Sequence, residues 1–220
     1  DSDVVDDMEL PDSPDAGDAG PPTTCWLSGT RCDWGGDFEM LESGSNPFGT
    51  LPAGSSNFVF SPDGCTVHFS SAGNLYRATR EAGNADFTTF VAISELNTDA
   101  AEDRVVQVAD NELIFVRRGA SRIGIVHRAS RATATDDWVD EGPVANLNTE
   151  GIATWDPFPS VDGQELFVAR APAVDAPQAI QLSQRPAGEE FGVPENLELA
   201  PDLVLAEPVL LEDLRTLIFV

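Results

Sequence analysis

The sequence contains no lysine: all 12 of its basic residues are arginines, set against 38 aspartates and glutamates. The net charge of −26 repels nucleic acids and anionic membrane surfaces, so neither is expected as a partner. Two origins explain such a composition equally well. One is a saline environment, in which an acidic surface keeps proteins soluble, and the other is a GC-rich genome, which encodes arginine in place of lysine.

Long apolar runs are also missing. No stretch approaches the roughly 18 apolar residues of a membrane-spanning helix, so no transmembrane segment is expected. The chain opens at Asp1 with neither an initiator methionine nor a signal peptide, and residues 216–220 read as a strand with nothing after it. We therefore expect a trimmed product or a fragment of a longer protein.

Catalytic motifs are absent too. The two histidines, His68 and His127, fall in separate predicted strands, and there is no nucleophile elbow, zinc-protease helix, phosphate-binding loop or dinucleotide fingerprint. These absences weigh against an enzyme, although two carboxylates that converge from different repeats leave no motif. We therefore predict no catalytic, cofactor-binding or metal-binding residues.

Cysteine is scarce, with three residues in the chain. Cys25 and Cys32 bracket a Ser-Gly turn, and in an oxidising compartment a disulfide between them would close a small loop worth up to about 2–3 kcal/mol. A metal site at this pair lacks the further ligands that coordination requires. Cys65 replaces an ordinary polar residue beside a hairpin turn and is predicted to be a free thiol. Catalytic use of this thiol is not expected, because His68, three residues on, falls on the opposite face of a strand.

What is present divides the chain into three parts. Residues 1–24 hold eight acidic residues, no basic residue and four prolines, which predicts a disordered acidic tether. Residues 25–53 bring in aromatic residues and two cysteines, and form a lead-in segment. Residues 54–220 carry an internal repeat.

Each copy of the repeat consists of a short strand, a turn that contains aspartate, and a second strand that ends in an aromatic residue. The aromatic residues are spaced by 46, 52 and 52 positions at Phe69, Phe115, Phe167 and Phe219. Asp-Gly and Asp-Asn supply the positive φ that tight hairpins need. The structural turn residues are predicted to be Asp63, Gly64, Asp110, Asn111, Asp162, Gly163 and Asp213.

The complete copies continue with a third strand ending in Arg80, Arg131 or Arg185, and then a fourth segment. Four short antiparallel strands that recur every ~40–50 residues are typical of a propeller blade. We therefore predict an all-β fold, a β-propeller of about 3.5 to 4 four-stranded antiparallel blades. The predicted blades span about 54–97, 98–148, 149–200 and, partially, 201–220. The ring is either incomplete or closed by the lead-in segment.

Ser-Pro-Asp-Gly at residues 61–64, followed by Val67-His-Phe69 and Ala78-Thr-Arg80, resembles the TolB-type, WD-like β-propeller repeat of bacterial extracytoplasmic proteins. Residues 156–163 resemble it nearly as closely, and the resemblance covers about residues 54–220. It implies a protein of the periplasm, outer membrane or cell surface. An acidic tether before such repeats is similar to secreted bacterial lipoproteins, which implies a lipid anchor upstream of the chain.

The resemblance implies a non-catalytic binding or scaffold module for a protein, peptide or glycan. The alternative is a propeller-fold hydrolase or lyase that acts on a glycan or peptide. The turn aspartates are interpreted as acceptors of backbone N–H bonds. Asp156 and Glu207, with Asn57 at the matching position, are interpreted as residues that tie neighbouring strands. Calcium is the metal that these oxygens would suit. The strand-ending arginines and the group Arg117, Arg118 and Arg122 either bind an acidic ligand or pair with local carboxylates.

Overall fold

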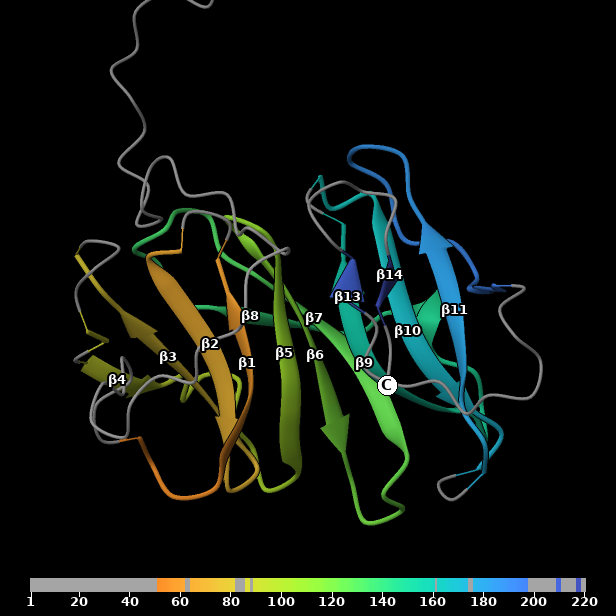
Figure 1. Cartoon of the computed structure of the whole chain (residues 1–220), viewed down its shortest axis with the longest axis horizontal. Coiled ribbons are helices and arrows are strands. Elements are labelled where there is room, and N and C mark those ends of the chain that lie inside the picture. The colour runs from red at the N-terminus through yellow and green to blue at the C-terminus, as the bar shows by residue number, and fades with distance from the viewer. Residues whose placement is uncertain are drawn as a thin grey trace, which may run out of the picture.

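The computed structural model describes residues 51–61, 64–81, 86–87, 89–160, 162–173 and 176–197, and the backbone of residues 209–210 and 217–218. Nearly all regular structure in these ranges is β-strand, and their one helical element is the short 3₁₀ turn η1 (Ala145–Leu147). The prediction of an all-β fold is confirmed (Figure 1).

Three four-stranded antiparallel sheets make up the described fold, and the strands of each sheet are paired in chain order. The first sheet contains β1 (Ser55–Phe60), β2 (Thr66–Ser71), β3 (Asn74–Thr79) and β4 (Thr89–Ala92). The second sheet contains β5 (Ala101–Ala109), β6 (Glu112–Arg118), β7 (Gly124–Ser130) and β8 (Val139–Pro143). The third sheet contains β9 (Ala153–Pro159), β10 (Glu165–Ala171), β11 (Ala179–Gln184) and β12 (Glu195–Asn196).

Glycines at the turns between first and second strands adopt the left-handed backbone that these turns require. Gly64 and Gly163 have φ of 68° and 66°. Their N–H groups donate to the carbonyls of Ser61 (2.8 Å) and Ser160 (2.9 Å). A Cβ on Gly163 would lie 2.7 Å from the carbonyl oxygen of Val108, so a side chain is excluded where this turn meets the second sheet.

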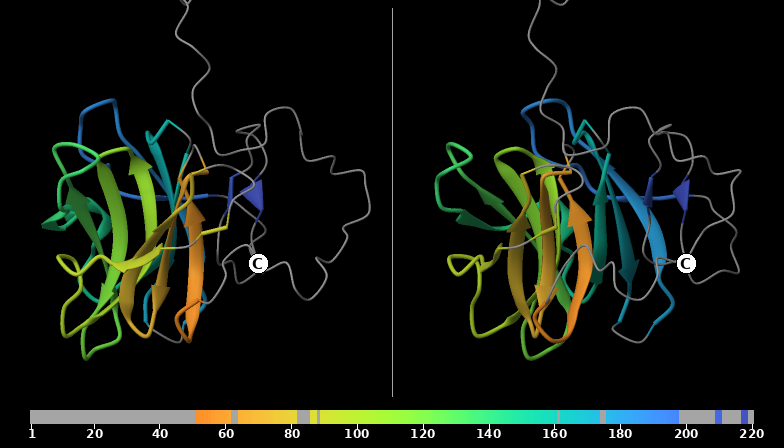
Figure 2. Two further views of the ribbon diagram at one scale, coloured as in Figure 1. Left: turned by 90° about the vertical axis from the view of Figure 1, so that its left-hand side faces the viewer. Right: turned by 60° about the vertical axis from the view of Figure 1, so that its left-hand side comes forward.

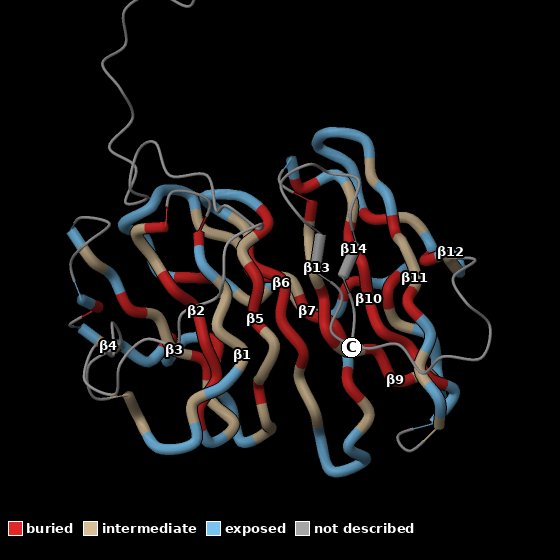
Figure 3. The backbone as a smooth tube through the Cα atoms, viewed as in Figure 1, coloured by how far each residue is buried: buried red, intermediate tan, exposed pale blue. Residues whose placement is uncertain are grey.

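The sheets stack side by side through their apolar faces (Figures 1 and 2). Between the first and second sheets, the buried cluster comprises Leu75, Ile93, Leu96, Val105, Leu113, Phe115, Ala129 and Trp138. Between the second and third sheets, it comprises Val106, Val108, Ile114, Val126, Val144, Leu147, Leu166, Val168 and Phe191. Figure 3 shows this burial along the middle of the strands. Removing these faces from water is the main stabilising contribution to the stack.

The sequence alignment of the copies on Phe69, Phe115 and Phe167 places the second strand of the third sheet one residue away from its position in the structure. The residue after each third strand donates its backbone N–H to the first residue before the second strand, at Cys65, Asn111 and Gln164. Four residues on from these acceptors lie Phe69, Phe115 and Val168. The interval between the second and third copies is therefore 168 − 115 = 53 residues, and Phe167 faces the opposite side of its sheet from Val168.

A fourth copy begins beyond the third sheet. The two-residue strands β13 (Val209–Leu210) and β14 (Leu217–Ile218) pair antiparallel. β13 contacts β9, as β9 contacts β5 and β5 contacts β1. β13 therefore takes the place of the next first strand, because each first strand contacts the first strand of the preceding copy.

Candidate functional site

The first strand of each sheet has a left-handed residue at the same position. The φ values are 57°, 53° and 49° at Asn57, Arg104 and Asp156. Each lies two residues after the position paired with the end of the second strand, and the register shifts beside it as in a β-bulge. A non-glycine residue in this conformation is strained by about 1 kcal/mol or more, and such strain gathers at functional sites.

Polar contacts link these positions across the three sheets. We call the group Asn57, Asp103, Arg104, Arg118 and Asp156 the first-strand cluster. Asn57 Nδ2 donates to Asp103 Oδ1 at 3.3 Å, and Asp103 forms ion pairs with Arg118 and, at 3.4 Å, with Arg104. Arg104 Nη1 lies 2.6 Å from Asp156 Oδ1. The chain of contacts therefore runs from the first sheet through the second to the third.

The first-strand cluster balances its charges. It contains two carboxylates, which are largely buried, and two guanidinium groups, which are about one-third exposed (29% for Arg104 and 36% for Arg118). The Nε of Arg118 is buried and has no hydrogen-bond partner among the described residues. The cluster therefore offers alternating donors and acceptors with no net charge, an arrangement suited to hydroxyl and amide groups.

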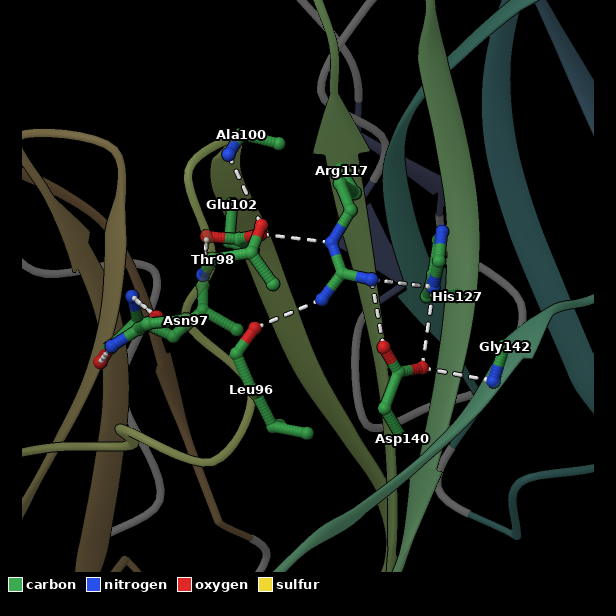
Figure 4. A network of polar contacts seen from close by, with 10 residues as sticks. Leu96, Asn97, Thr98, Ala100, Glu102, Arg117, His127, Asp140 and Gly142 are labelled. Atoms are coloured by element: carbon green, nitrogen blue, oxygen red, sulfur yellow. Dashed lines mark hydrogen bonds and ion pairs between the residues drawn. The ribbon is translucent and has the colours of Figure 1, made fainter.

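A second polar network crosses all four strands of the second sheet. Figure 4 shows Arg117 on β6 between Glu102 of β5 on one side and His127 of β7 with Asp140 of β8 on the other. Arg117 Nε donates to Glu102 Oε1 at 2.8 Å, Nη1 donates to Asp140 Oδ2 at 2.7 Å, and Nη2 donates to the Leu96 carbonyl at 2.9 Å. Glu102 is completely buried, so this network is part of the interior.

Two groups of this network, His127 and Asp140, have pKa values below their usual ranges. Burial lowers the pKa of His127, although its hydrogen bond with Asp140 acts in the opposite direction. Burial would raise the pKa of Asp140, but hydrogen bonds from Arg117, the Gly142 N–H and His127 outweigh it and hold that pKa below its usual value. A neutral imidazole beside an ionised carboxylate is the pairing of a catalytic triad. The 3.2 Å contact of His127 Nδ1 with Asp140 matches the triad, but the same Nδ1 also lies 3.3 Å from Arg117 Nη1, a contact that the triad does not have.

The arginines that follow the third strands clamp the turns of their own sheets. Arg80, Arg131 and Arg185 each donate from the side chain to a carbonyl in the turn between first and second strands, over 2.7–3.1 Å. Their guanidinium carbons lie 4.8, 4.2 and 4.2 Å from the ring centroids of Phe87, Trp138 and Phe191. Arg185 also makes a bidentate ion pair with Glu112 of the second sheet. The predicted pairing with a local carboxylate is therefore seen at Arg185, whereas the contacts of Arg80 and Arg131 described here go to carbonyls and aromatic rings.

The described turn residues engage the backbone and neighbouring side chains. Asp162 Oδ1 accepts from Ser160 Oγ (2.6 Å) and the Gln164 N–H (3.0 Å), and these bonds lower the pKa of Asp162. The Asp110 carbonyl accepts from the Arg131 guanidinium. Asp110 and Asn111 form the two-residue turn between β5 and β6, but neither has a positive φ, so the positive φ predicted for the Asp-Asn turn is wrong. Within the described ranges, no three His, Cys, Asp or Glu side chains are grouped to hold a metal ion. Among the other predicted turn residues, those outside the described residues are Asp63 and Asp213.

Cys65 differs from its prediction. It is disulfide-bonded, not a free thiol. The other cysteines of the chain, Cys25 and Cys32, form the predicted disulfide candidate and lie outside the described residues. The sulfur of Cys65 is therefore part of a covalent link at the turn before β2 and is not available as a free thiol.

Comparison with protein-family models and with curated proteins finds no match for this chain. In the part of the chain that the structure describes, no helix is both long and apolar enough to cross a membrane. The repeated positions of the three sheets are therefore the features that point to a function. Sequence patterns flagged Asn57 and Asp156 as matching residues, and the structure adds Asp103, Arg104 and Arg118 to them.

Proposed function

We propose that this chain is part of a TolB-like β-propeller that acts as a non-catalytic binding module outside the bacterial cytoplasm. Its sheets serve as blades, and their first strands line the axis. The proposal is supported by four-stranded antiparallel sheets in chain order and by the contacts of β5 with β1 and β9. A disulfide at Cys65 fits an oxidising compartment.

The observation that carries the binding role is the first-strand cluster. Three copies of the repeat keep a strained bulge at one position and place Asn57, Arg104 and Asp156 there. A repeat that served packing alone would favour glycine at a left-handed position. Polar side chains at this position, joined by ion pairs and still partly open to water, favour a surface that recognises a peptide or glycan through hydrogen bonds.

Binding is favoured over catalysis by the partners of the carboxylates. A glycoside hydrolase needs one carboxyl group that carries a proton and one that is ionised. Asp103 and Asp156 instead share one guanidinium, that of Arg104, so their surroundings do not differ in the way that distinguishes an acid from a base. The hydrolase or lyase alternative therefore lacks its acid at this cluster.

The experiment is binding of the purified chain to a glycan array and a peptide array. Arg104→Gln and Asp156→Asn preserve size and remove charge from the cluster, and Arg128→Gln is the matched control because Arg128 pairs with Glu190 elsewhere (2.6 Å). We expect a ligand on one array, with affinity reduced at least tenfold by the first two variants and unchanged by the control. Equal binding by all variants, or no ligand on either array, contradicts the proposal. Substrate turnover that Asp156→Asn abolishes would favour the hydrolase or lyase.

A further inference from the structure

Arg170 in the third sheet is a buried cation without a carboxylate partner among the described residues. Its side chain lies on β10 and is 8% exposed. Nη1 donates to Gln181 Oε1 at 2.9 Å and Nη2 donates to Thr149 Oγ1 at 2.7 Å, so both partners are neutral. The Nε atom is buried and has no hydrogen-bond partner in the described part of the chain.

The second sheet shows what such an arginine has when its charge is neutralised. Arg117 stands at the same position of its sheet, because it pairs with Glu102 of the first strand as Arg170 pairs with Thr154. Glu102 and Asp140 supply Arg117 with two carboxylates. In the third sheet, Thr154 replaces the glutamate and donates its hydroxyl to a backbone carbonyl instead.

A buried guanidinium without an anion is strongly destabilising, because it has lost its hydration without gaining a countercharge. Burial lowers the pKa of Arg170, in accord with this loss. The described residues use two of the five N–H donors of the guanidinium, and among them the Nε–H and one N–H on each Nη have no partner. An Nε–H and an Nη–H on one edge form the planar fork that matches a carboxylate.

We infer that Arg170 is a binding site for the carboxylate group of a small ligand, with Thr149 and Gln181 fixing the guanidinium in place. Gln181 is itself held by Asn196, to which its Nε2 donates at 2.7 Å, so the fork is oriented before a ligand arrives. A monocarboxylate is favoured over sulfate or phosphate because the protein carries a net charge of −26, which repels multiply charged anions more strongly.

The test is titration of the folded chain with acetate and with glucuronate at constant ionic strength, followed by NMR shifts and by melting temperature. Glucose and sulfate serve as the neutral and the multiply charged comparisons. Acetate binding as tight as glucuronate binding assigns a bare carboxylate, whereas tighter glucuronate binding assigns a sugar acid. We expect wild type to bind a carboxylate in preference to both comparisons, and Arg170→Gln to bind it at least tenfold more weakly.

Thr154→Glu provides the second variant, because it places a carboxylate where Glu102 stands in the second sheet. It is expected to raise the melting temperature and to compete with the ligand, which also keeps the test decisive if Arg170→Gln does not fold. The control, Arg128→Gln, is expected to leave binding unchanged.

Equal carboxylate affinity in wild type and Arg170→Gln would overturn the inference. The inference would also be overturned if wild type bound no carboxylate and Glu198→Gln, Asp202→Asn or Glu207→Gln lowered the melting temperature as much as Arg170→Gln. The countercharge of Arg170 would then belong to the chain itself. The inference does not depend on the first-strand cluster, whose variants are different ones, so either proposal can fail alone.

Discussion

Arg185 joins the third sheet to the second, and its replacement by alanine is expected to destabilise the stack. Its Nη1 and Nη2 atoms donate to Glu112 Oε1 and Oε2 at 2.8 and 2.7 Å, and its Nε donates to the Gly163 carbonyl at 2.9 Å. The guanidinium also lies 4.2 Å from the ring centroid of Phe191. One side chain thus holds a turn, an aromatic ring and a neighbouring sheet.

The expected magnitude follows from burial. The side chains of Arg185 and Glu112 are 13% and 15% exposed, so Arg185→Ala leaves a mostly buried carboxylate without its partner. Breaking a buried pair in this way costs about 3–5 kcal/mol of unfolding free energy. Because both side chains retain some access to water, the expected loss for Arg185→Ala is about 3 kcal/mol. Arg131 makes the same turn and ring contacts without an ion pair among the described residues, so Arg131→Ala is expected to cost about 1–2 kcal/mol.

Urea denaturation at pH 7 and low salt, followed by tryptophan fluorescence, measures both variants without screening the ion pair. A double-mutant cycle with Glu112→Ala isolates the pair, and we expect a coupling energy of about 2 kcal/mol. If Arg185→Ala costs no more than Arg131→Ala and the coupling is below about 0.5 kcal/mol, apolar stacking alone holds the sheets together. The role assigned to this arginine would then be wrong.

Three further predictions concern sulfur and protons. Peptide mapping without reduction is expected to find Cys65 linked to Cys25 or Cys32, and recovery of Cys65 as a free thiol would contradict the bond. His68 has a buried Nδ1 without a partner among the described residues, so His68→Leu is expected to add about 1 kcal/mol of stability at pH 7 in urea titrations. Burial lowers the pKa of His68 to about 3, so the unfolded chain binds more protons from about pH 6.5 down to that value. Wild type should therefore lose stability across this window, and His68→Leu should lose less; parallel curves would refute the assignment. Asp140 has a lowered pKa, so its contribution is present above the unfolded value and is lost as the pH falls below about 4. Asp140→Asn should destabilise at pH 7 and flatten the acid limb of the stability curve.

The strands and sheets could be predicted from sequence because their signals are local. Asp-Gly and Asp-Asn pairs specify hairpin turns within a few residues, and alternation on either side specifies the strands. Gly163 illustrates the accuracy of this signal, since its positive φ and its close approach to Val108 both require glycine. The repeat then follows from recurrence of the same local pattern.

The register of the third copy could not be predicted by matching aromatic residues. The interval from the first-strand bulge to the residue before the second strand is one residue longer in the third copy, from Asp156 to Gln164, than in the second copy, from Arg104 to Asn111. In a strand, a one-residue offset moves every side chain to the other face. Val168 therefore occupies the position of Phe115, while Phe167 packs with Ile180 on the opposite face. Hydrogen bonds across the turn determine this register, and composition does not.

The first-strand cluster was only partly visible in the sequence because its contacts are long-range. Asn57 and Asp103 are 46 positions apart and meet only when two sheets stack. Arg104 looked like the ordinary beginning of a strand, since a bulge has no distinct local signal. Asn57 and Asp156 stand at matching positions of their copies, and this match is the signal that the sequence offers for the cluster. It indicates residues that tie neighbouring strands, but it reveals neither the left-handed backbone nor the ion pairs.

Comparison of the copies with one another separates the positions that build the sheet from those that differ. The clamp of an arginine on an aromatic ring occurs in all three sheets, and an asparagine tie occurs in two: Asn97 and Asn148 each accept from and donate to the backbone of the third strand, at Leu75 and Val126. Contacts retained while most other side chains change are those that the sheet itself requires.

The end of the second strand behaves in the opposite way. The equivalent positions hold Ser71, Arg117 and Arg170, facing Ser55, Glu102 and Thr154 in the first strands. A hydroxyl pair, an ion pair and an arginine facing a hydroxyl cannot all serve one structural purpose. Because the same backbone tolerates all three, the sheet does not dictate these side chains. These three positions lie beside the strained first-strand positions, so this end of the stack is where binding should be sought.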